Sequence, residues 1–255
     1  MPPVILVMSP EVRETTGFSG GKSAELDQDR CTGCGKCLEL CRYDAVIEEN
    51  GIYKIDKTAC EGCGVCAYFC PAKAIEMVDE ENGEWYISDT AYGPMVHARL
   101  NAGGENSGKL VTLVRSQARR IAKESKLETI LVDGSPGIGC PVIASITGAD
   151  AVLAVTEPSM SGLHDLKRVV GLGRHFGIRV LVAVNKYDIN EDITDEILRF
   201  VKDEELEIAG RVHYDIDVTL AQIAGKSVVE FSDGPASSDI NELWRYVADL
   251  LKLEV

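Results

Sequence analysis

Short apolar runs alternate with amphipathic stretches along the part of the chain that follows residue 84. Apolar runs rich in β-branched residues are typical of parallel strands that are buried on both faces. The amphipathic stretches carry an apolar stripe at helical spacing, as helices that cover such a sheet do. This order predicts a doubly wound α/β domain. We expect its strands at 129–133, 151–156 and 180–185, and its helices at 107–125, 162–176, 192–202 and 239–253.

The pattern differs between residues 22 and 80, where two loops rich in Cys and Gly interrupt short runs of strand-forming residues. Short strands around two similar loops predict a small α+β domain. We therefore expect a domain at 22–80 that is inserted into the larger domain, which comprises residues 1–21 and 81–255. The expected strands of the insert are 24–27, 45–48, 53–56 and 74–78.

Eight of the nine cysteines form a repeated pattern, C-x2-C-x2-C-x3-C, whose second copy lies 29 residues after the first. This spacing is typical of bacterial ferredoxins, in which three close cysteines bind one [4Fe–4S] cluster and the fourth binds the other cluster. The sequence therefore predicts two clusters and one-electron transfer. The first ligand set is expected to be Cys31, Cys34, Cys37 and Cys70. The second ligand set is expected to be Cys60, Cys63, Cys66 and Cys41.

Two other interpretations of the cysteines fit less well. Disulfide frameworks are typical of secreted proteins, and Met1 to Pro10 lacks the basic flank and cleavage site of a secretory signal. Structural zinc sites usually use paired C-x2-C knuckles, without a third cysteine and an x3-C ending. Cys140, the ninth cysteine, is expected to be a small buried residue at the start of a helix.

The composition of the chain limits the classes of partner that it can bind. The chain has 255 residues, of which 45% are hydrophobic, and 41 acidic against 26 basic residues give a formal net charge of −15. An acidic chain repels phosphate backbones and anionic lipid surfaces, so nucleic acid is not expected as a partner. No apolar run reaches the length of a membrane span, and a cytoplasmic protein is expected.

Two segments have residue types that bind nucleotides in P-loop NTPases. Asp133 follows an apolar run, where a carboxylate could hold Mg²⁺, and Gly137 leaves an amide free for a γ-phosphate. Asn185 and Asp188 follow a later strand, where they could contact adenine or guanine. An ordinary Asp-Gly turn and a capped strand-to-helix loop are the structural alternatives.

Two other segments only partly match a phosphate-binding loop. Residues 103–109 satisfy G-x4-G-K, but Leu110 stands where a hydroxyl should bind Mg²⁺. Residues 17–23 contain a Lys-Ser pair but have one residue too few between their glycines, and we expect them to form a loop. Neither segment is predicted to bind phosphate.

Taken together, the motifs resemble those of MinD-superfamily P-loop ATPases with an inserted ferredoxin domain. The resemblance depends on the duplicated cysteine pattern and on segments 105–110, 132–141, 157–166 and 185–188. It implies a P-loop NTPase-like doubly wound sheet, bound ATP and Mg²⁺, and either a homodimer or a pair with a related ATPase subunit. It also implies a redox partner protein.

The chain departs from this family at its beginning. The family has a strand and a K-G-G-x-G-K-[ST] loop there, and nothing similar precedes Pro2. We therefore expect the N-terminal phosphate-binding part to be lacking, assign no catalytic residue, and do not expect this chain alone to hydrolyse ATP. A sheet without that strand has unpaired amides that cost about 1–3 kcal/mol each when buried, so low stability is expected.

The leading functional hypothesis is an iron–sulfur electron-transfer protein whose redox state is coupled to nucleotide state in the intact protein. One alternative is a scaffold that assembles clusters and hands them to other proteins. Another alternative is a ferredoxin module on an α/β domain that does not bind nucleotide.

Overall fold

The computed structural model describes residues 3–101 and 108–253. Residues 103–107 of the G-x4-G-K segment and the first residue of the predicted helix 107–125 lie outside the described residues. The chain divides into two compact units. Unit 1 comprises Met1–Glu11, Asp89–Met95 and Arg115–Val255, and unit 2 comprises Val12–Ser88 and Val96–Val114.

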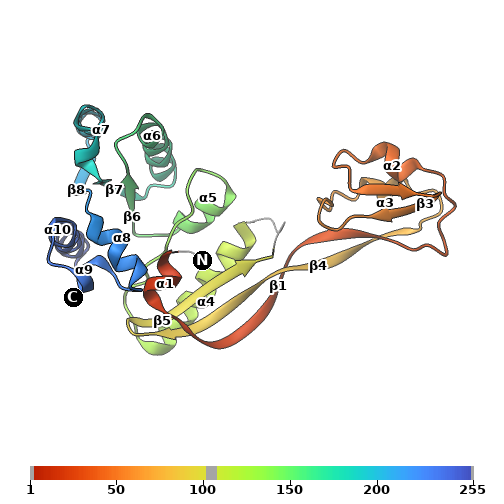
Figure 1. The fold of residues 1–255 in the computed structure, drawn as a ribbon, viewed down its shortest axis with the longest axis horizontal. Coiled ribbons are helices and arrows are strands. Elements are labelled where there is room, and N and C mark those ends of the chain that lie inside the picture. The colour runs from red at the N-terminus through yellow and green to blue at the C-terminus, as the bar shows by residue number, and fades with distance from the viewer. Residues whose placement is uncertain (1–2, 102–107, 254–255) are drawn as a thin grey trace. The chain divides into compact units, whose positions relative to one another are not determined.

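Figure 1 labels the strands and helices in chain order. The strands are β1 (Glu11–Leu26), β2 (Val46–Glu49), β3 (Ile52–Ile55), β4 (Ile75–Thr90), β5 (Gly93–Leu100), β6 (Ala151–Thr156), β7 (Arg179–Asn185) and β8 (Glu207–Val212). The helices are α1 (Pro3–Met8), α2 (Lys36–Leu40), α3 (Val65–Phe69), α4 (Gly108–Ser125), α5 (Cys140–Ile146), α6 (Met160–His175), α7 (Glu191–Asp203), α8 (Ile216–Ile223), α9 (Val228–Phe231) and α10 (Pro235–Leu251), with a 3₁₀ turn, η1, at Tyr187–Ile189.

Unit 1 contains a parallel sheet in the order β6-β7-β8. Apolar side chains of α6 and α7, among them Leu166 and Ile197, pack against Val182 on one face of β7. On the other face, Leu181 packs with Val247 of α10. Helices therefore cover both faces of the central strand (Figure 1), as the predicted doubly wound architecture requires.

The sequence pattern missed β8 because this strand does not read as a continuous apolar run. It contains Glu207, Gly210 and Arg211. A Cβ atom at Gly210 would lie 3.0 Å from Cβ of Leu243 in α10, so a small residue lets the helix approach the strand closely. Tertiary packing, rather than strand propensity, therefore decides this element.

The predicted strand at 129–133 is wrong. This segment is irregular in the structure, and the side chain of Leu131 is 87% exposed. Among the described residues this segment pairs with no strand, and the sheet ends at β6. An apolar run forms a strand only where a neighbouring strand takes up its amides and a packed layer covers its side chains.

Most of a second sheet, in the order β1-β4-β5, belongs to unit 2. β1 and β4 run side by side towards the small domain that contains β2, β3, α2 and α3 (Figure 1). The predicted loop at 17–23 is wrong, because these residues belong to β1. Glycine is uncommon inside strands, so the glycines of this segment hid the strand pattern in the sequence. In the structure, the amide of Gly20 donates a hydrogen bond to Oδ1 of Asn82 in β4 over 2.9 Å.

The small domain contains a hairpin in which β2 pairs antiparallel with β3, from Val46 opposite Ile55 to Glu49 opposite Ile52. Strands expected at 45–48 and 53–56 lie within one residue of these bounds. The strand segments expected at 24–27 and 74–78 are the ends of the much longer β1 and β4. The sequence thus located the strands beside the cysteine loops, but not their extension away from the loops.

Two leucine-to-alanine substitutions test the correction at 129–133. Leu131→Ala should change the free energy of unfolding by about 0.5 kcal/mol or less, because its side chain is already exposed. Leu181→Ala deletes the same atoms from a site with 0% exposure and should cost about 2–5 kcal/mol. Urea denaturation followed by circular dichroism measures both, and equal losses would show that Leu131 is buried.

Candidate metal centre

The two cysteine loops have the same backbone geometry. Each loop leads through a left-handed glycine into a helix of five residues, with φ and ψ of 72° and −3° at Gly35 and of 73° and 0° at Gly64. The fourth cysteine of each pattern, Cys41 or Cys70, ends that helix in an extended conformation, with φ of −74° or −67°. The 29-residue repeat in the sequence is therefore a repeat in structure.

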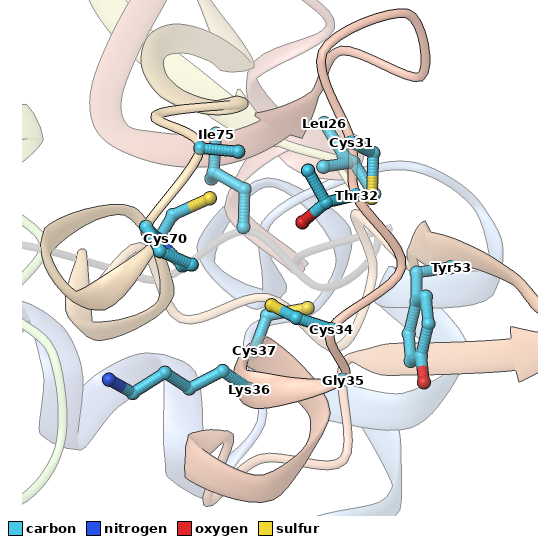
Figure 2. A pocket seen from close by; sticks show the side chains of 12 residues that line it. Leu26, Cys31, Thr32, Cys34, Gly35, Lys36, Cys37, Tyr53, Cys70 and Ile75 are labelled. Carbon is cyan, nitrogen blue, oxygen red and sulfur yellow. The ribbon is translucent and has the colours of Figure 1, made fainter.

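The predicted first ligand set surrounds one pocket. Cys31, Cys34 and Cys37 of the first loop and Cys70 of the second line a space of about 320 Å³ that is partly open to solvent. Figure 2 shows these four cysteine side chains around the pocket. Apolar atoms complete its wall. They belong to residues that include Leu26, Tyr53, Pro71, Ala72 and Ile75.

The predicted second ligand set also comes together. Burial raises the pKa of the Cys66 thiol, and the charges of Cys60, Cys63 and Cys41 raise it further, whereas a hydrogen bond from the Ala67 backbone lowers it. Cys41, which belongs to the first loop, is therefore close enough to Cys66 to affect the pKa of its thiol. Both predicted sets are therefore groups of neighbouring thiols in the structure.

Backbone amides point at several of the sulfur atoms. The amide of Gly33 lies 3.5 Å from Sγ of Cys31, and the amide of Ala74 lies 3.3 Å from Sγ of Cys70. In the second set, the amide of Ala24 in β1 lies 3.5 Å from Sγ of Cys60. Amides in such positions stabilise thiolates and the negative charge of a sulfur-bound cluster.

The chemical type of the side chains around the pocket determines which inorganic group fits there. Within residues 3–101 and 108–253, no group of three or more His, Cys, Asp or Glu residues is arranged to hold a metal ion. The first set instead surrounds a space, and its donors are all sulfur. Cysteine thiolates are the ligands of [4Fe–4S] clusters, so the residues present fit such a group.

The predicted nucleotide residues have less support. Asp133 is exposed in the irregular segment, and Gly137 follows it with a φ of +88°. Asn185 ends β7, and the next residue, Lys186, forms an ion pair with Glu157 over 2.7 Å at the corresponding end of β6. Because parallel strands end at the same edge of their sheet, Asn185 and Glu157 both lie at that edge.

A polar network beside Asp188 was not found from the sequence. Oδ1 of Asp188 accepts a hydrogen bond from the amide of Tyr214 over 2.7 Å, which supports a structural role for this carboxylate. Nearby, the Tyr187 hydroxyl contacts Nε2 of His213 over 2.7 Å, and Nδ1 of His213 contacts Asp239 over 2.6 Å. These residues belong to separate elements, so no spacing rule could pair them.

Cys140 is the first residue of α5, as expected, but its side chain is exposed and not buried. No helix in the described residues is long and apolar enough to cross a membrane.

Comparison with known proteins supports the cluster interpretation. Residues 24–77 match the model of the 4Fe-4S dicluster domain. The uncharacterized protein MJ0578 of Methanocaldococcus jannaschii is 30% identical over 88% of this chain and 74% of that protein. The chain belongs to the family of MJ0578.

Other relatives cover less of the chain. MJ0579 of the same organism, also uncharacterized, is 28% identical over 43% of this chain and 39% of that protein. A MinD cell division protein of Aquifex aeolicus is 24% identical over 55% of this chain and 60% of its own, with a TM-score of 0.46. In the Aquifex MinC:MinD complex, the match covers 67% of this chain with a TM-score of 0.49. The chain thus spans less than two thirds of the length of MJ0579 and of the Aquifex MinD protein with the TM-score of 0.46.

These findings confirm the predicted dicluster domain and place the chain in the family of MJ0578. The dicluster match at residues 24–77 falls inside unit 2.

Two glycine substitutions test how tightly the cysteine loops are packed. Gly62 has a φ of +61°, and a Cβ atom there would lie 2.0 Å from the carbonyl oxygen of Lys22. Gly33 has a φ of +67° but nothing within 4 Å of such an atom. Gly33→Ala should cost only the left-handed conformation, about 1–2 kcal/mol. Gly62→Ala should cost clearly more and reduce the iron retained after anaerobic reconstitution, measured by iron analysis. Equal effects would contradict the close approach of the second loop to β1.

Proposed function

We propose that this chain is an electron-transfer protein that binds two [4Fe–4S] clusters, one at each ligand set. The observation that carries the proposal is the pocket that three cysteines of one loop share with the fourth cysteine of the other loop. Such sharing between two copies of a sequence pattern has a direct explanation in a two-cluster ferredoxin. A disulfide or a zinc knuckle would not require it.

Each part of the site has a separate task in this proposal. The thiolates of the two ligand sets would hold the clusters, which supply one-electron transfer when bound. The amides of Gly33, Ala74 and Ala24 would donate to sulfur and favour the reduced state. Leu26 and Ile75 present apolar surface to the first set and limit its contact with water. Four cysteines per cluster favour a carrier over a scaffold that releases its clusters.

The α/β part suggests a second element of the proposal. Asn185 would contact the base of ATP, and Asp133 with Gly137 would respond to Mg²⁺ and the γ-phosphate. The chemistry of these residue types and the position of Asn185 at the carboxyl edge of the sheet support this. Redox state and nucleotide state would then be coupled, with a redox protein as electron partner and a second copy or a related subunit as assembly partner. The cytoplasm is the proposed location.

Double cysteine variants distinguish shared ligation from separate ligation. Wild-type protein reconstituted without oxygen should hold about eight irons. Cys34→Ala with Cys70→Ala removes two ligands of the first set, so about four irons should remain. Cys34→Ala with Cys41→Ala damages both sets, and far fewer irons should remain. Iron analysis and the low-temperature EPR signal of the reduced protein measure these outcomes.

The reverse result, with iron retained by the Cys34/Cys41 variant and lost from the Cys34/Cys70 variant, would show that each loop binds its own cluster. Cys140→Ala is the matched control, because it removes an exposed thiol outside both sets. Wild-type protein that holds no iron would remove the basis of the proposal.

Nucleotide binding is tested by a pair of asparagine variants. Asn185→Ala should weaken Mg-ATP binding about tenfold, the equivalent of about 1.4 kcal/mol, because it removes a contact to the base. Asn241→Ala is the control, since its amide donates to the carbonyl oxygen of Ser237 within α10. Equilibrium dialysis with labelled ATP and GTP measures both. If bound ATP also shifts the cluster potentials, the nucleotide site and the cluster sites are coupled. An unchanged affinity of the Asn185→Ala variant for ATP would contradict the contact with the base.

A further inference from the structure

Lys36 brings a positive charge to the pocket of the first ligand set. Among the described residues, it is the one Lys or Arg that lines this pocket, and no Asp or Glu lines it. Figure 2 shows Lys36 beside Cys37. Its Nζ lies 5.6 Å from the centre of the Phe69 ring, and Phe69 is the residue before Cys70. The ammonium group is therefore held near two elements that carry ligands of the first set.

No carboxylate neutralises this ammonium group. Within the part of the chain that the structure describes, Lys36 forms no ion pair, whereas Lys54 pairs with Glu49 over 2.9 Å in the same small domain. The face of an aromatic ring attracts a cation but does not cancel its charge. Lys36 thus contributes a full positive charge beside the first set.

The cysteine repeat provides an internal comparison with the second set. Val65 stands 29 residues after Lys36, and each is the first residue of a five-residue helix that follows a left-handed glycine. The two loops have the same backbone geometry there, so Val65 occupies the place in the second loop that Lys36 has in the first. The side chain at this place is charged in one loop and uncharged in the other.

The other charged residues at equivalent positions do not replace Lys36. Glu61 is the equivalent of Thr32, and Arg42 is the equivalent of Pro71, and both Thr32 and Pro71 line the first pocket. The opposite charges of Glu61 and Arg42 cancel in sum. The remaining equivalents of the lining residues are cysteines or uncharged residues. The repeat therefore predicts one more positive charge around the first set than around the second.

We propose that the Lys36 ammonium group holds the reduction potential of the first cluster above that of the second. This inference rests on the proposed function and extends it to an inequality between the two clusters. A cluster that accepts an electron gains one negative charge, and a nearby positive charge stabilises that state. An electron on the second cluster then passes to the first, which is reduced as the second is oxidised. A single electron in the domain resides mainly on the first cluster.

Lys36→Met tests this in the reconstituted full chain by a redox titration followed by EPR. The variant removes the charge and keeps a long unbranched side chain. The reduction equilibrium constant of the first cluster should fall twofold to fivefold, about 18–41 mV for a one-electron couple. Lys36→Arg keeps the charge and should keep the potential. Lys54→Met is the matched control, because Glu49 already pairs with that ammonium group, and it should leave the difference between the two potentials unchanged.

Single-cluster variants assign the shift. In the Cys41→Ala, Cys63→Ala background, which leaves the first set intact, Lys36→Met should lower the potential. A shift that appears only in the Cys34→Ala, Cys70→Ala background, which leaves the second set intact, would overturn the proposal.

Val65→Lys is the reciprocal variant, and it covers the case in which Lys36→Met fails to retain iron. It places an ammonium group at the equivalent position of the second loop, so the potential of the second cluster should rise by a similar amount. An unchanged second potential in this variant, with wild-type iron content, would contradict the proposal.

Salt distinguishes the charge of Lys36 from its packing on Phe69. Raising the salt concentration from about 0.1 M to 1 M shortens the screening length from about 10 Å to about 3 Å, so the Lys36→Met shift should shrink. A shift of constant size would show that packing causes it. Equal potentials in wild-type protein and Lys36→Met, with equal iron content, would overturn the inference and leave the two-cluster function intact. Absence of clusters from the wild-type protein would instead defeat the proposed function itself.

Discussion

The site depends on the direction that the chain takes after each five-residue helix of the cysteine loops. Cys41 and Cys70 end these helices in extended conformations, and each lies beside the close cysteines of the other loop. Each group of neighbouring thiols is therefore drawn from both loops.

The same strands that carry the small domain also form the walls of its sites. β1 supplies Leu26 to the pocket of the first set and the amide of Ala24 to the second set. β4 begins at Ile75, which also lines the first pocket. A change in the twist or pairing of these two strands would thus reach both sites through the backbone.

The central strand of the α/β part is well packed, whereas apolar side chains at the edge of its sheet are exposed. β7 is buried on both faces, whereas Leu153 and Val155 of β6 are exposed, as is the apolar segment around Leu131. The polar groups that follow the strands are largely engaged with one another, as in the ion pair of Glu157 with Lys186 and the contacts of Asp188 and His213. These contacts fix the loops at the carboxyl edge of the sheet, where a ligand of an α/β protein binds.

The sequence by itself determined the features that depend on local spacing. The 29-residue repeat predicted which cysteines lie together, and apolar runs predicted β6 and β7 to within one residue, because buried strands and cysteine loops have strong local patterns. Tertiary structure decided the rest. Residues 17–23 belong to a strand that pairs with β4, whereas residues 129–133 pair with no strand among the described residues. The contact of Lys36 with Phe69 and the His213–Asp239 contact likewise arise from elements distant in sequence, where burial and partners are set by packing and not by local pattern.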